Sequence, residues 1–218
     1  MTMPFQNAEV TGTVYGIALN DKAQRDRLAA TFAEPPYKAP PKAPVLYIKP
    51  RNCLRYCGAP TPVPAELSAL KVAATVALLF ERDLTRAVPE EVRSALAGAC
   101  LALDISEPID SFYRPAIRQM CRDGFLPLGR FASVPERFGD IVTEVDGREV
   151  HRWSLDALVR PIEAAAAEIS GFMTLRAGDL LLVGVPGDAP LASVGGTITV
   201  QSAGLNALSA SLVPEQGQ

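Results

Sequence analysis

The sequence predicts a β-rich α+β fold, with a mixed β-sheet core and a few peripheral helices. The 218 residues are 48% hydrophobic, which is enough apolar surface for one compact core. Short apolar or alternating segments bounded by Gly and Pro recur along the chain, whereas helical patterns are few and short. We therefore expect a single domain over residues 1–218.

The first 50 residues predict two strands separated by a helix and a loop. Residues 11–20 mix β-branched and apolar side chains and predict a strand, and residues 22–33 have the pattern of an amphipathic helix. Residues 34–44 contain five prolines. Because proline lacks the N–H donor that a helix interior or a sheet requires, this segment predicts a surface loop. Residues 45–50 predict the second strand.

The remaining chain carries further local signals. The apolar run 73–80 predicts a strand buried on both faces. Residues 89–104 start with proline and two acidic residues and end in an apolar stretch, which predicts a helix leading into a strand. Asp146-Gly147 lies between alternating apolar positions and predicts a β-hairpin. Ser154 is a candidate helix cap, Pro161 predicts a kink or a break, and Gly-rich turns join the closing strands.

Charge and cysteine content exclude several classes of partner. The net charge is -3 and the basic residues are scattered, so no basic surface is expected to bind nucleic acid. No apolar run approaches membrane-spanning length, and the start of the chain lacks a signal-peptide pattern, so we expect a cytoplasmic protein. The four cysteines are Cys53, Cys57, Cys100 and Cys121, and we expect them to be reduced structural thiols. A zinc site is not expected, since His151 is the only histidine. We expect His151 to face solvent.

Several separated segments occur in an order that is typical of one family. They are ALN at 18–20, YKAPPKAPVLYIKPRN at 37–52, ATVALL at 74–79, LDISEP at 103–108, SFYRPAI at 111–117, CRDGFLPLG at 121–129, VDG at 145–147 and LRAGDLLLVGVP at 175–186. On these residues the chain resembles the fumarylacetoacetate hydrolase superfamily over nearly its whole length. Within it, the chain is most similar to the amino-terminal half of the bifunctional isomerase/decarboxylase of 4-hydroxyphenylacetate degradation, here as a free-standing subunit.

The resemblance implies a mixed β-sandwich roll, with an N-terminal strand, helix and Pro-rich loop in 1–44 and the main β-roll in 45–218. It also implies a subunit of a 2-hydroxyhepta-2,4-diene-1,7-dioate isomerase / 5-oxopent-3-ene-1,2,5-tricarboxylate decarboxylase. Both reactions pass through a dienolate, whose charge a divalent cation stabilises as a Lewis acid. We expect magnesium in this role, a small dicarboxylic keto-acid as substrate, and either a homodimer or a hetero-oligomer with a metal-bearing subunit of the same fold.

The residues expected to hold that metal are largely replaced. The family pattern places a Glu-x-Glu pair on one face of a strand and an Asp on a later segment. Ala73 and Thr75 stand at the two Glu positions, and Asp104 matches the third ligand. Only a remnant of the metal site is therefore predicted, and a partner subunit is expected to hold the magnesium.

Further positions depart from the family pattern. Met120 stands where the family has a lysine, Asp21 stands where it has a histidine, and the turn 183–186 lacks the usual hydroxyl groups. Methionine can neither transfer a proton nor stabilise an enolate by charge. One alternative is an altered metal cluster made by Asp21, Asp104 and Asp123.

Arg122 and Asp123 match the pocket-facing motif and are the predicted catalytic residues. A guanidinium fork suits a dicarboxylate terminus, so Arg122 is also a predicted substrate ligand, together with Lys49, Tyr113 and Arg114. Each has a structural alternative. Arg122 and Asp123 can form an ion pair with each other or with neighbours, Lys49 can be a solvated surface charge, and the two residues before Pro115 can simply pack.

Three functions are therefore open. The first is an enzyme subunit that works with a metal-bearing subunit of the same fold. The second is a catalytically silent structural partner, or a small-acid binding protein, that has kept the fold and lost the chemistry. The third is an independent decarboxylase or hydrolase that uses the altered aspartate cluster.

Overall fold

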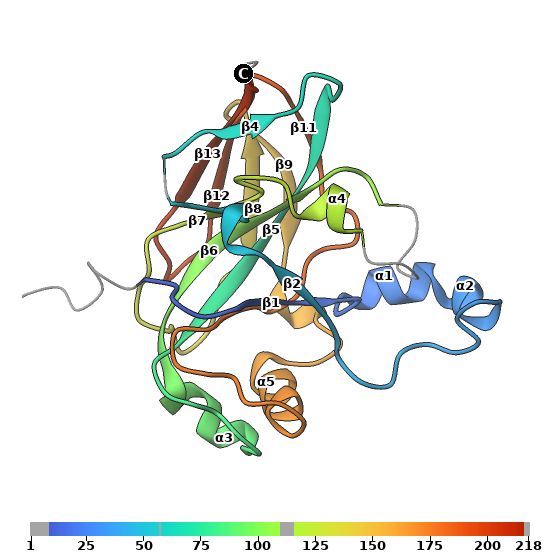
Figure 1. Cartoon of the computed structure of the whole chain (residues 1–218), viewed down its shortest axis with the longest axis vertical. Helices are drawn as coiled ribbons and strands as arrows, with labels where there is room; N and C mark the ends of the chain where they lie inside the picture. Colours follow the sequence, from blue (N-terminus) through green and yellow to red (C-terminus); the bar gives the residue numbers. More distant parts are fainter. Residues whose placement is uncertain (1–8, 57, 110–115, 216–218) are drawn as a thin grey trace, which may run out of the picture.

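The computed structural model of the chain describes residues 9–56, 58–109 and 116–215. Two sheets form its centre (Figure 1). The eight-stranded sheet has the order β2-β1-β10-β5-β6-β7-β3, with β11 paired to β5; its strands are β1 (Val14–Ala18), β2 (Val45–Lys49), β3 (Leu54–Tyr56), β5 (Ala69–Phe80), β6 (Leu96–Ser106), β7 (Leu126–Leu128), β10 (Leu180–Leu182) and β11 (Leu191–Ser193).

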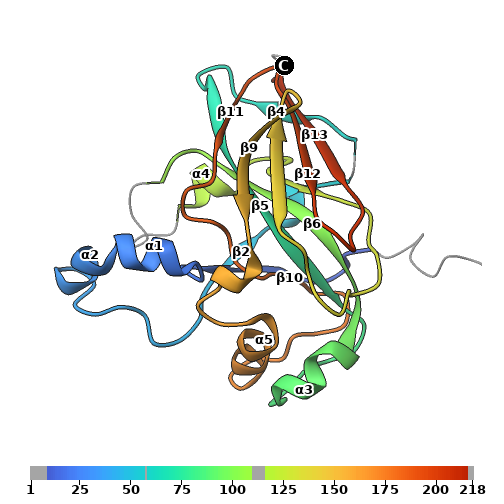
Figure 2. The same cartoon turned by 180° about the vertical axis from the view of Figure 1, so that it is seen from behind.

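The five-stranded sheet has the order β4-β13-β12-β8-β9. Its strands are β4 (Thr61–Val63), β8 (Ile141–Val145), β9 (Arg148–Trp153), β12 (Thr197–Gln201) and β13 (Leu208–Pro214). Figure 2 shows this sheet in front of the long strands β5 and β6. Both sheets mix parallel and antiparallel pairs. The predicted β-rich sandwich roll with few helices is confirmed.

The expectation that the apolar run 73–80 is buried on both faces is also confirmed. Even-numbered side chains of β5, such as Val72 and Val76, belong to the core cluster that also contains Ile198 and Leu208 of the five-stranded sheet. Odd-numbered ones, such as Ala77, belong to a second cluster on the opposite face. Because successive strand residues point to opposite faces, one apolar run supplies both cores.

The eight-stranded sheet curls strongly around the second cluster. The Tyr47 hydroxyl on β2 donates a hydrogen bond to Asp104 on β6, although β1, β10 and β5 lie between these strands in the sheet. In a flat sheet they would be about 19 Å apart, since neighbouring strands are about 4.8 Å apart. The curl encloses buried apolar side chains that include Val14, Cys53, Leu126, Leu128 and Leu182.

Gly16 makes this close approach possible. It pairs with Tyr47 across β1 and β2, and a Cβ atom on Gly16 would overlap the Tyr47 ring. The aromatic ring thus lies directly over the strand backbone, which only glycine permits.

The hairpin predicted at Asp146-Gly147 joins β8 to β9 and is confirmed. Both turn residues have positive φ, 50° at Asp146 and 76° at Gly147. Two consecutive positive φ values define the turn whose twist matches that of the flanking strands. The Asp146 carboxylate also accepts a hydrogen bond from the Thr197 N–H at 2.9 Å, which fastens the turn to β12.

The helices are short and peripheral: α1 (Lys22–Arg27), α2 (Ala29–Ala33), α3 (Pro89–Val92), α4 (Ile117–Met120) and α5 (Ile162–Ser170), with 3₁₀ turns at Arg51–Cys53, Arg93–Ala95 and Leu155–Ala157. In Figure 1, α3 and α5 lie together below the sheets and α1 and α2 project to one side. Within the described ranges, no helix is long and apolar enough to cross a membrane.

Two helix predictions need correction in detail. The helix expected over 22–33 is interrupted at Leu28, after which Phe32 is buried and meets the Tyr37 ring edge-on at 5.7 Å. Ser154 caps only the 3₁₀ turn that follows it, and α5 begins after Pro161, so proline causes the break there. The helix leading into a strand over 89–104 is confirmed, as is the loop over 34–44.

Gly16→Ala tests the close approach of β2 to β1. The added methyl group collides with the Tyr47 ring, so the free energy of unfolding is expected to fall by about 1–3 kcal/mol, as in other overpacked cores. Denaturant titration measures the effect. In a Tyr47→Ala background the same glycine substitution is expected to cost little, and an equal cost in both backgrounds would contradict this account.

Candidate functional site

Toward the start of β5, the face that carries Ala77 of the second cluster becomes more polar. Lys71, Ala73 and Thr75 alternate onto this face of β5. Across the ladder, Ala73 lies opposite Asp104 and Lys71 lies opposite Ser106. The structure therefore brings together the three positions at which the sequence analysis predicted the remnant of a metal site.

Asp104 is the centre of a buried polar network. Its Oδ1 lies 2.6 Å from the Lys49 ammonium, and its Oδ2 accepts the hydrogen bond from Tyr47. Lys49 is 1% exposed and Asp104 is 4% exposed. The buried Asp104 carboxylate is thus neutralised by a residue 55 positions away in the chain. The alternative of a solvated surface Lys49 is wrong.

The Lys49 ammonium is fully occupied. Besides Asp104, it donates to the carbonyls of Met120 at 2.6 Å, Ile105 at 3.0 Å and Phe125 at 3.3 Å. A lysine ammonium has three N–H donors. Lys49 therefore fastens β2 to the end of β6 and to the segment 120–125, and it retains no free donor.

The Tyr47 phenol is held in its neutral form. Burial raises the pKa of Tyr47 well above 10.0, and the neighbouring Asp104 carboxylate raises the pKa further by charge repulsion and by accepting the phenolic hydrogen bond. The network thus contains one ion pair and one neutral donor, an arrangement in which each buried polar group has a partner.

These residues do not fit a divalent cation. Both oxygens of Asp104 are engaged, and Ala73 offers only a methyl group. The Thr75 hydroxyl donates to the Gly184 carbonyl. Across the described ranges, no three His, Cys, Asp or Glu side chains form a group that could hold a metal ion.

The alternative aspartate cluster is not formed either. The Asp21 carboxylate accepts from the N–H groups of Gln24 and Gly187, both at 3.1 Å, so it caps α1 and holds the turn. Asp123 is exposed and accepts from the Asn52 side chain at 2.7 Å. Neither carboxylate joins Asp104.

Arg122 pairs with neighbouring carboxylates. Its guanidinium lies 2.7 Å from Glu107 and 3.4 Å from Glu66, and its side chain is 23% exposed. The ion pairs with neighbours proposed as its structural alternative are therefore present. Tyr113 and Arg114, the other predicted substrate ligands, lie outside the described residues.

The turn 183–187 is held in place by several hydrogen bonds. The Asn20 side chain donates to the Val183 carbonyl at 2.8 Å, and Thr75 holds the Gly184 carbonyl. The Lys71 ammonium donates to the Gly187 carbonyl at 3.2 Å. These contacts position the turn beside β5 although it lacks the hydroxyl groups of the family pattern.

Two residues of this region, Lys71 and Tyr47, were not predicted from the sequence, and a third, His151, was misplaced. Lys71 was within reach, because it precedes Ala73 by two residues and strand side chains alternate with that period. Tyr47 shares a face with Lys49 for the same reason. The expectation that His151 faces solvent is wrong: its side chain is 12% exposed, and its Nε2 lies 3.1 Å from Asp188.

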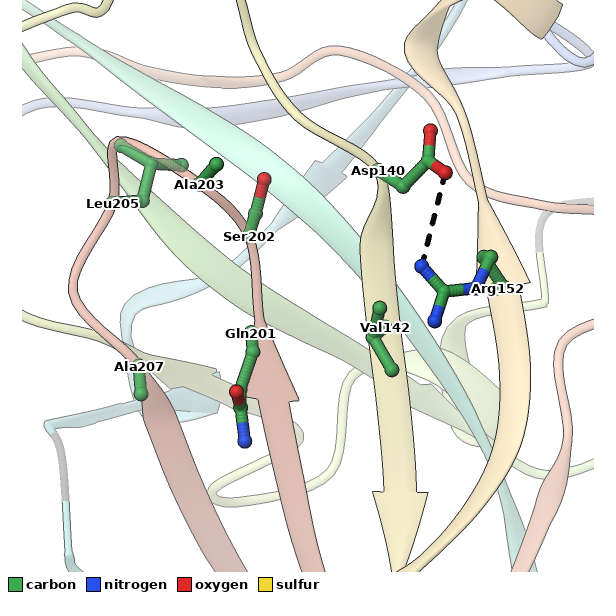
Figure 3. A pocket seen from close by; sticks show the side chains of 8 residues that line it. All are labelled: Asp140, Val142, Arg152, Gln201, Ser202, Ala203, Leu205 and Ala207. Atoms are coloured by element: carbon green, nitrogen blue, oxygen red, sulfur yellow. Dashed lines mark ion pairs between the residues drawn. The ribbon is translucent and has the colours of Figure 1, made fainter.

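Two surface hollows of about 560 Å³ each lie elsewhere. Figure 3 shows one of them on the five-stranded sheet, where Arg152 lies 3.8 Å from Asp140 beside Val142 and Gln201. Arg152 is also held by Glu149 at 2.9 Å. The other hollow lies beside Arg55 and three prolines. Neither contains a predicted site residue.

The class of protein follows from a match that spans most of the chain. Residues 13–213 match the model of the family described as fumarylacetoacetate (FAA) hydrolase C-terminal. The chain belongs to this family.

The relatives make the comparison more specific. The chain is 39% identical over 205 residues to the 4-hydroxyphenylacetate degradation bifunctional isomerase/decarboxylase of Salmonella dublin, which covers 94% of this chain and 48% of the relative. The chain thus spans about half the length of that relative. It is 31% identical to the oxaloacetate tautomerase YcgM of Escherichia coli (strain K12), over 74% of this chain and 78% of the relative.

Solved structures agree with the fold. The fumarylpyruvate hydrolase of Pseudomonas aeruginosa, solved in complex with Mn2+ and pyruvate, aligns with a TM-score of 0.77 at 19% sequence identity. The alignment covers 94% of this chain and 90% of the hydrolase.

Lys49→Met is expected to lower the free energy of unfolding by about 3–5 kcal/mol, because it leaves the Asp104 carboxylate buried without its cation. Denaturant titration measures the loss. The double variant Lys49→Met/Asp104→Leu removes both charges and should be more stable than the single variant. A double variant as unstable as the sum of two single losses would contradict the ion pair.

High pH is expected to weaken the Tyr47 contact. The pKa of Tyr47 lies above 10.0 in the folded chain, whereas a phenol in the unfolded chain ionises near pH 10. The contribution of Tyr47 to stability is therefore present below about pH 10 and is lost as the pH rises further. The difference in the free energy of unfolding between the wild-type chain and Tyr47→Phe should therefore shrink between about pH 8 and about pH 11. A constant difference would contradict the raised pKa.

Proposed function

We propose that this chain is the metal-free half of an isomerase/decarboxylase that acts on 2-hydroxyhepta-2,4-diene-1,7-dioate and 5-oxopent-3-ene-1,2,5-tricarboxylate in 4-hydroxyphenylacetate catabolism. The observation that carries the proposal is the 39% identity over 94% of the chain with a relative of which it spans 48%. The metal-dependent work then falls to a second domain of the same fold, on this or another polypeptide.

The chemistry supports such a division. Moving a double bond in a dienedioate places negative charge on a dienolate, which needs a cation or hydrogen-bond donors nearby. In this chain the Lys49 ammonium and the Tyr47 hydroxyl are both committed to Asp104. A magnesium ion held by the second domain would supply the Lewis acid. In this proposal Lys49 has a positioning role, since it holds Asp104 and the segment 120–125 in place.

Substrate contacts in this chain are assigned to the pocket-facing motif. Arg122 pairs with Glu107 at 2.7 Å and with Glu66 at 3.4 Å, and in this proposal one substrate carboxylate takes the place of the more distant Glu66. Asp123 is exposed beside it and can accept a proton or a hydrogen bond. Tyr113 and Arg114 complete the proposed set of site residues. Three cysteines in the described segments, Cys53, Cys100 and Cys121, are free thiols, which supports a cytoplasmic location.

A catalytically silent partner is the second candidate. It is favoured by Met120, Ala73 and Thr75, none of which can replace the charged groups of the family pattern. In that case the chain would stabilise a metal-bearing domain of the same fold and take no part in turnover. The two candidates differ in whether substitutions at Arg122 change the reaction.

A reconstitution assay tests the proposal. The chain, a metal-bearing paralogue and their mixture are each followed by the loss of ultraviolet absorbance of the dienedioate, with magnesium or with a chelator. We expect no turnover by the chain alone and turnover by the mixture that exceeds that of the paralogue and stops with chelator. Arg122→Gln in the chain should lower the rate of the mixture by about 10-fold or more, the loss expected for a charged hydrogen bond.

Each other outcome has a defined meaning. Equal rates for the mixture and the paralogue alone would favour the silent partner. Chelator-sensitive turnover by the isolated chain would show that it holds its own metal and would contradict the division of labour. Absence of turnover in every preparation would rule out this substrate.

A further inference from the structure

We propose that Lys71, together with Arg27, binds a carboxylate group of the substrate beside Gly187 of the turn 183–187. This inference deepens the proposed function, and it rests on that function only for the identity of the substrate. The ligand class is a small 2-oxo or 2-hydroxy dicarboxylate.

The position of Lys71 is the first support. It lies on β5, two residues before Ala73 and on the same face, and it pairs with Ser106 of β6. Its side chain is half-buried, and its ammonium reaches the Gly187 carbonyl at 3.2 Å. Lys71 therefore stands between the sheet and the turn 183–187, beside the position at which Asp104 is buried.

The two lysines of the site, Lys49 and Lys71, differ in how many of their hydrogen-bond donors are free. Lys49 meets one carboxylate and three carbonyl groups. Lys71 meets one carbonyl, and among the described residues no carboxylate lies within 4.0 Å of its ammonium. Since an ammonium has three donors, Lys71 keeps two for a ligand, whereas Lys49 keeps none.

Electrostatics give the third support. Burial lowers the pKa of Lys71, the carboxylates of Asp188 and Asp104 raise it, and Arg27 lowers it. Asp104 is already neutralised by Lys49, and Asp188 is 66% exposed and contacts His151. A half-buried cation that lacks an ion pair is stabilised when an anion binds, because the anion replaces the lost hydration.

Arg27 supplies the second positively charged group beside Gly187. A Cβ atom on Gly187 would overlap the Arg27 guanidinium, so this group lies against the same glycine whose carbonyl Lys71 holds. Among the described residues no carboxylate lies within 4.0 Å of the Arg27 guanidinium, although Arg27 contributes to the lowered pKa of the exposed Asp188 carboxylate. One ammonium and one guanidinium around a single glycine suit a carboxylate, which accepts two donors from a guanidinium fork.

A binding experiment on this chain alone tests the inference. The probe is 2-oxoadipate, a stable 2-oxo dicarboxylate, and isothermal titration calorimetry gives its Kd for the wild-type chain, Lys71→Met, Lys71→Arg and Lys42→Met. Lys42 is an exposed lysine of the Pro-rich loop and serves as the matched control. Lys71→Met should weaken binding by about 10-fold or more. Lys71→Arg should bind within a few-fold of wild type, and Lys42→Met should match it.

The pH dependence separates a charge from a structural role. Binding to the wild-type chain should weaken with rising pH below the ordinary lysine value of 10.5, because the pKa of Lys71 is lowered, whereas Lys71→Arg should keep its affinity. Should Lys71→Met not fold, Lys71→Gln removes the charge and keeps a donor for the Gly187 carbonyl. Equal binding by the uncharged variant, equal loss in Lys42→Met, or no binding by the wild-type chain would overturn the proposal.

Failure here is distinct from failure of the proposed function. The titration requires no turnover and no second domain, so a chain that binds 2-oxoadipate through Lys71 but never turns over the dienedioate keeps the inference and loses the proposed reaction. If the reconstitution assay shows turnover but Lys71→Met binds 2-oxoadipate as well as the wild-type chain does, the proposed function is kept and the inference about Lys71 is lost.

Discussion

The buried ion pair between Lys49 and Asp104 is the contact on which the rest of the site depends. Two charges in a protein interior are costly unless their geometry and their remaining hydrogen bonds are satisfied. Here the ammonium donates to carbonyl groups of β6 and of the segment 120–125, and the carboxylate accepts a hydrogen bond from the Tyr47 hydroxyl. The pair thereby links β2 to the end of β6 across the curled eight-stranded sheet.

The same pair decides what chemistry this end of the sheet can support. The carboxylate that matches a metal ligand of the family is neutralised by an internal ammonium, and its strand partner Ala73 is uncharged. Asp104 thus forms an internal ion pair in this chain. The Lys71 ammonium, which is half-buried and meets one carbonyl, lies two residues before Ala73 on the same strand.

Local features were predictable because their causes are local. Asp146-Gly147 specifies its hairpin through two positive φ values, and the prolines of 34–44 exclude a helix or a sheet. The interruption at Leu28 was not predictable, because the helical pattern continues through it and Phe32 of α2 packs against Tyr37, which lies outside the helix. The site was predicted as a set of residue positions, without their pairing.

The sequence by itself determined the family, through the order of several separated segments. It also determined the kinds of element and the absence of the Glu-x-Glu pair, which depend on residue types at short spacing. Only the tertiary structure decided that Lys49 forms an ion pair with Asp104 and that Tyr47 donates a hydrogen bond to the same carboxylate. It also decided that the Lys71 ammonium keeps hydrogen-bond donors without a partner among the described residues. The physical reason is distance along the chain. Residues 47, 49 and 104 meet because a sheet curls across three intervening strands, and no local pattern encodes that closure.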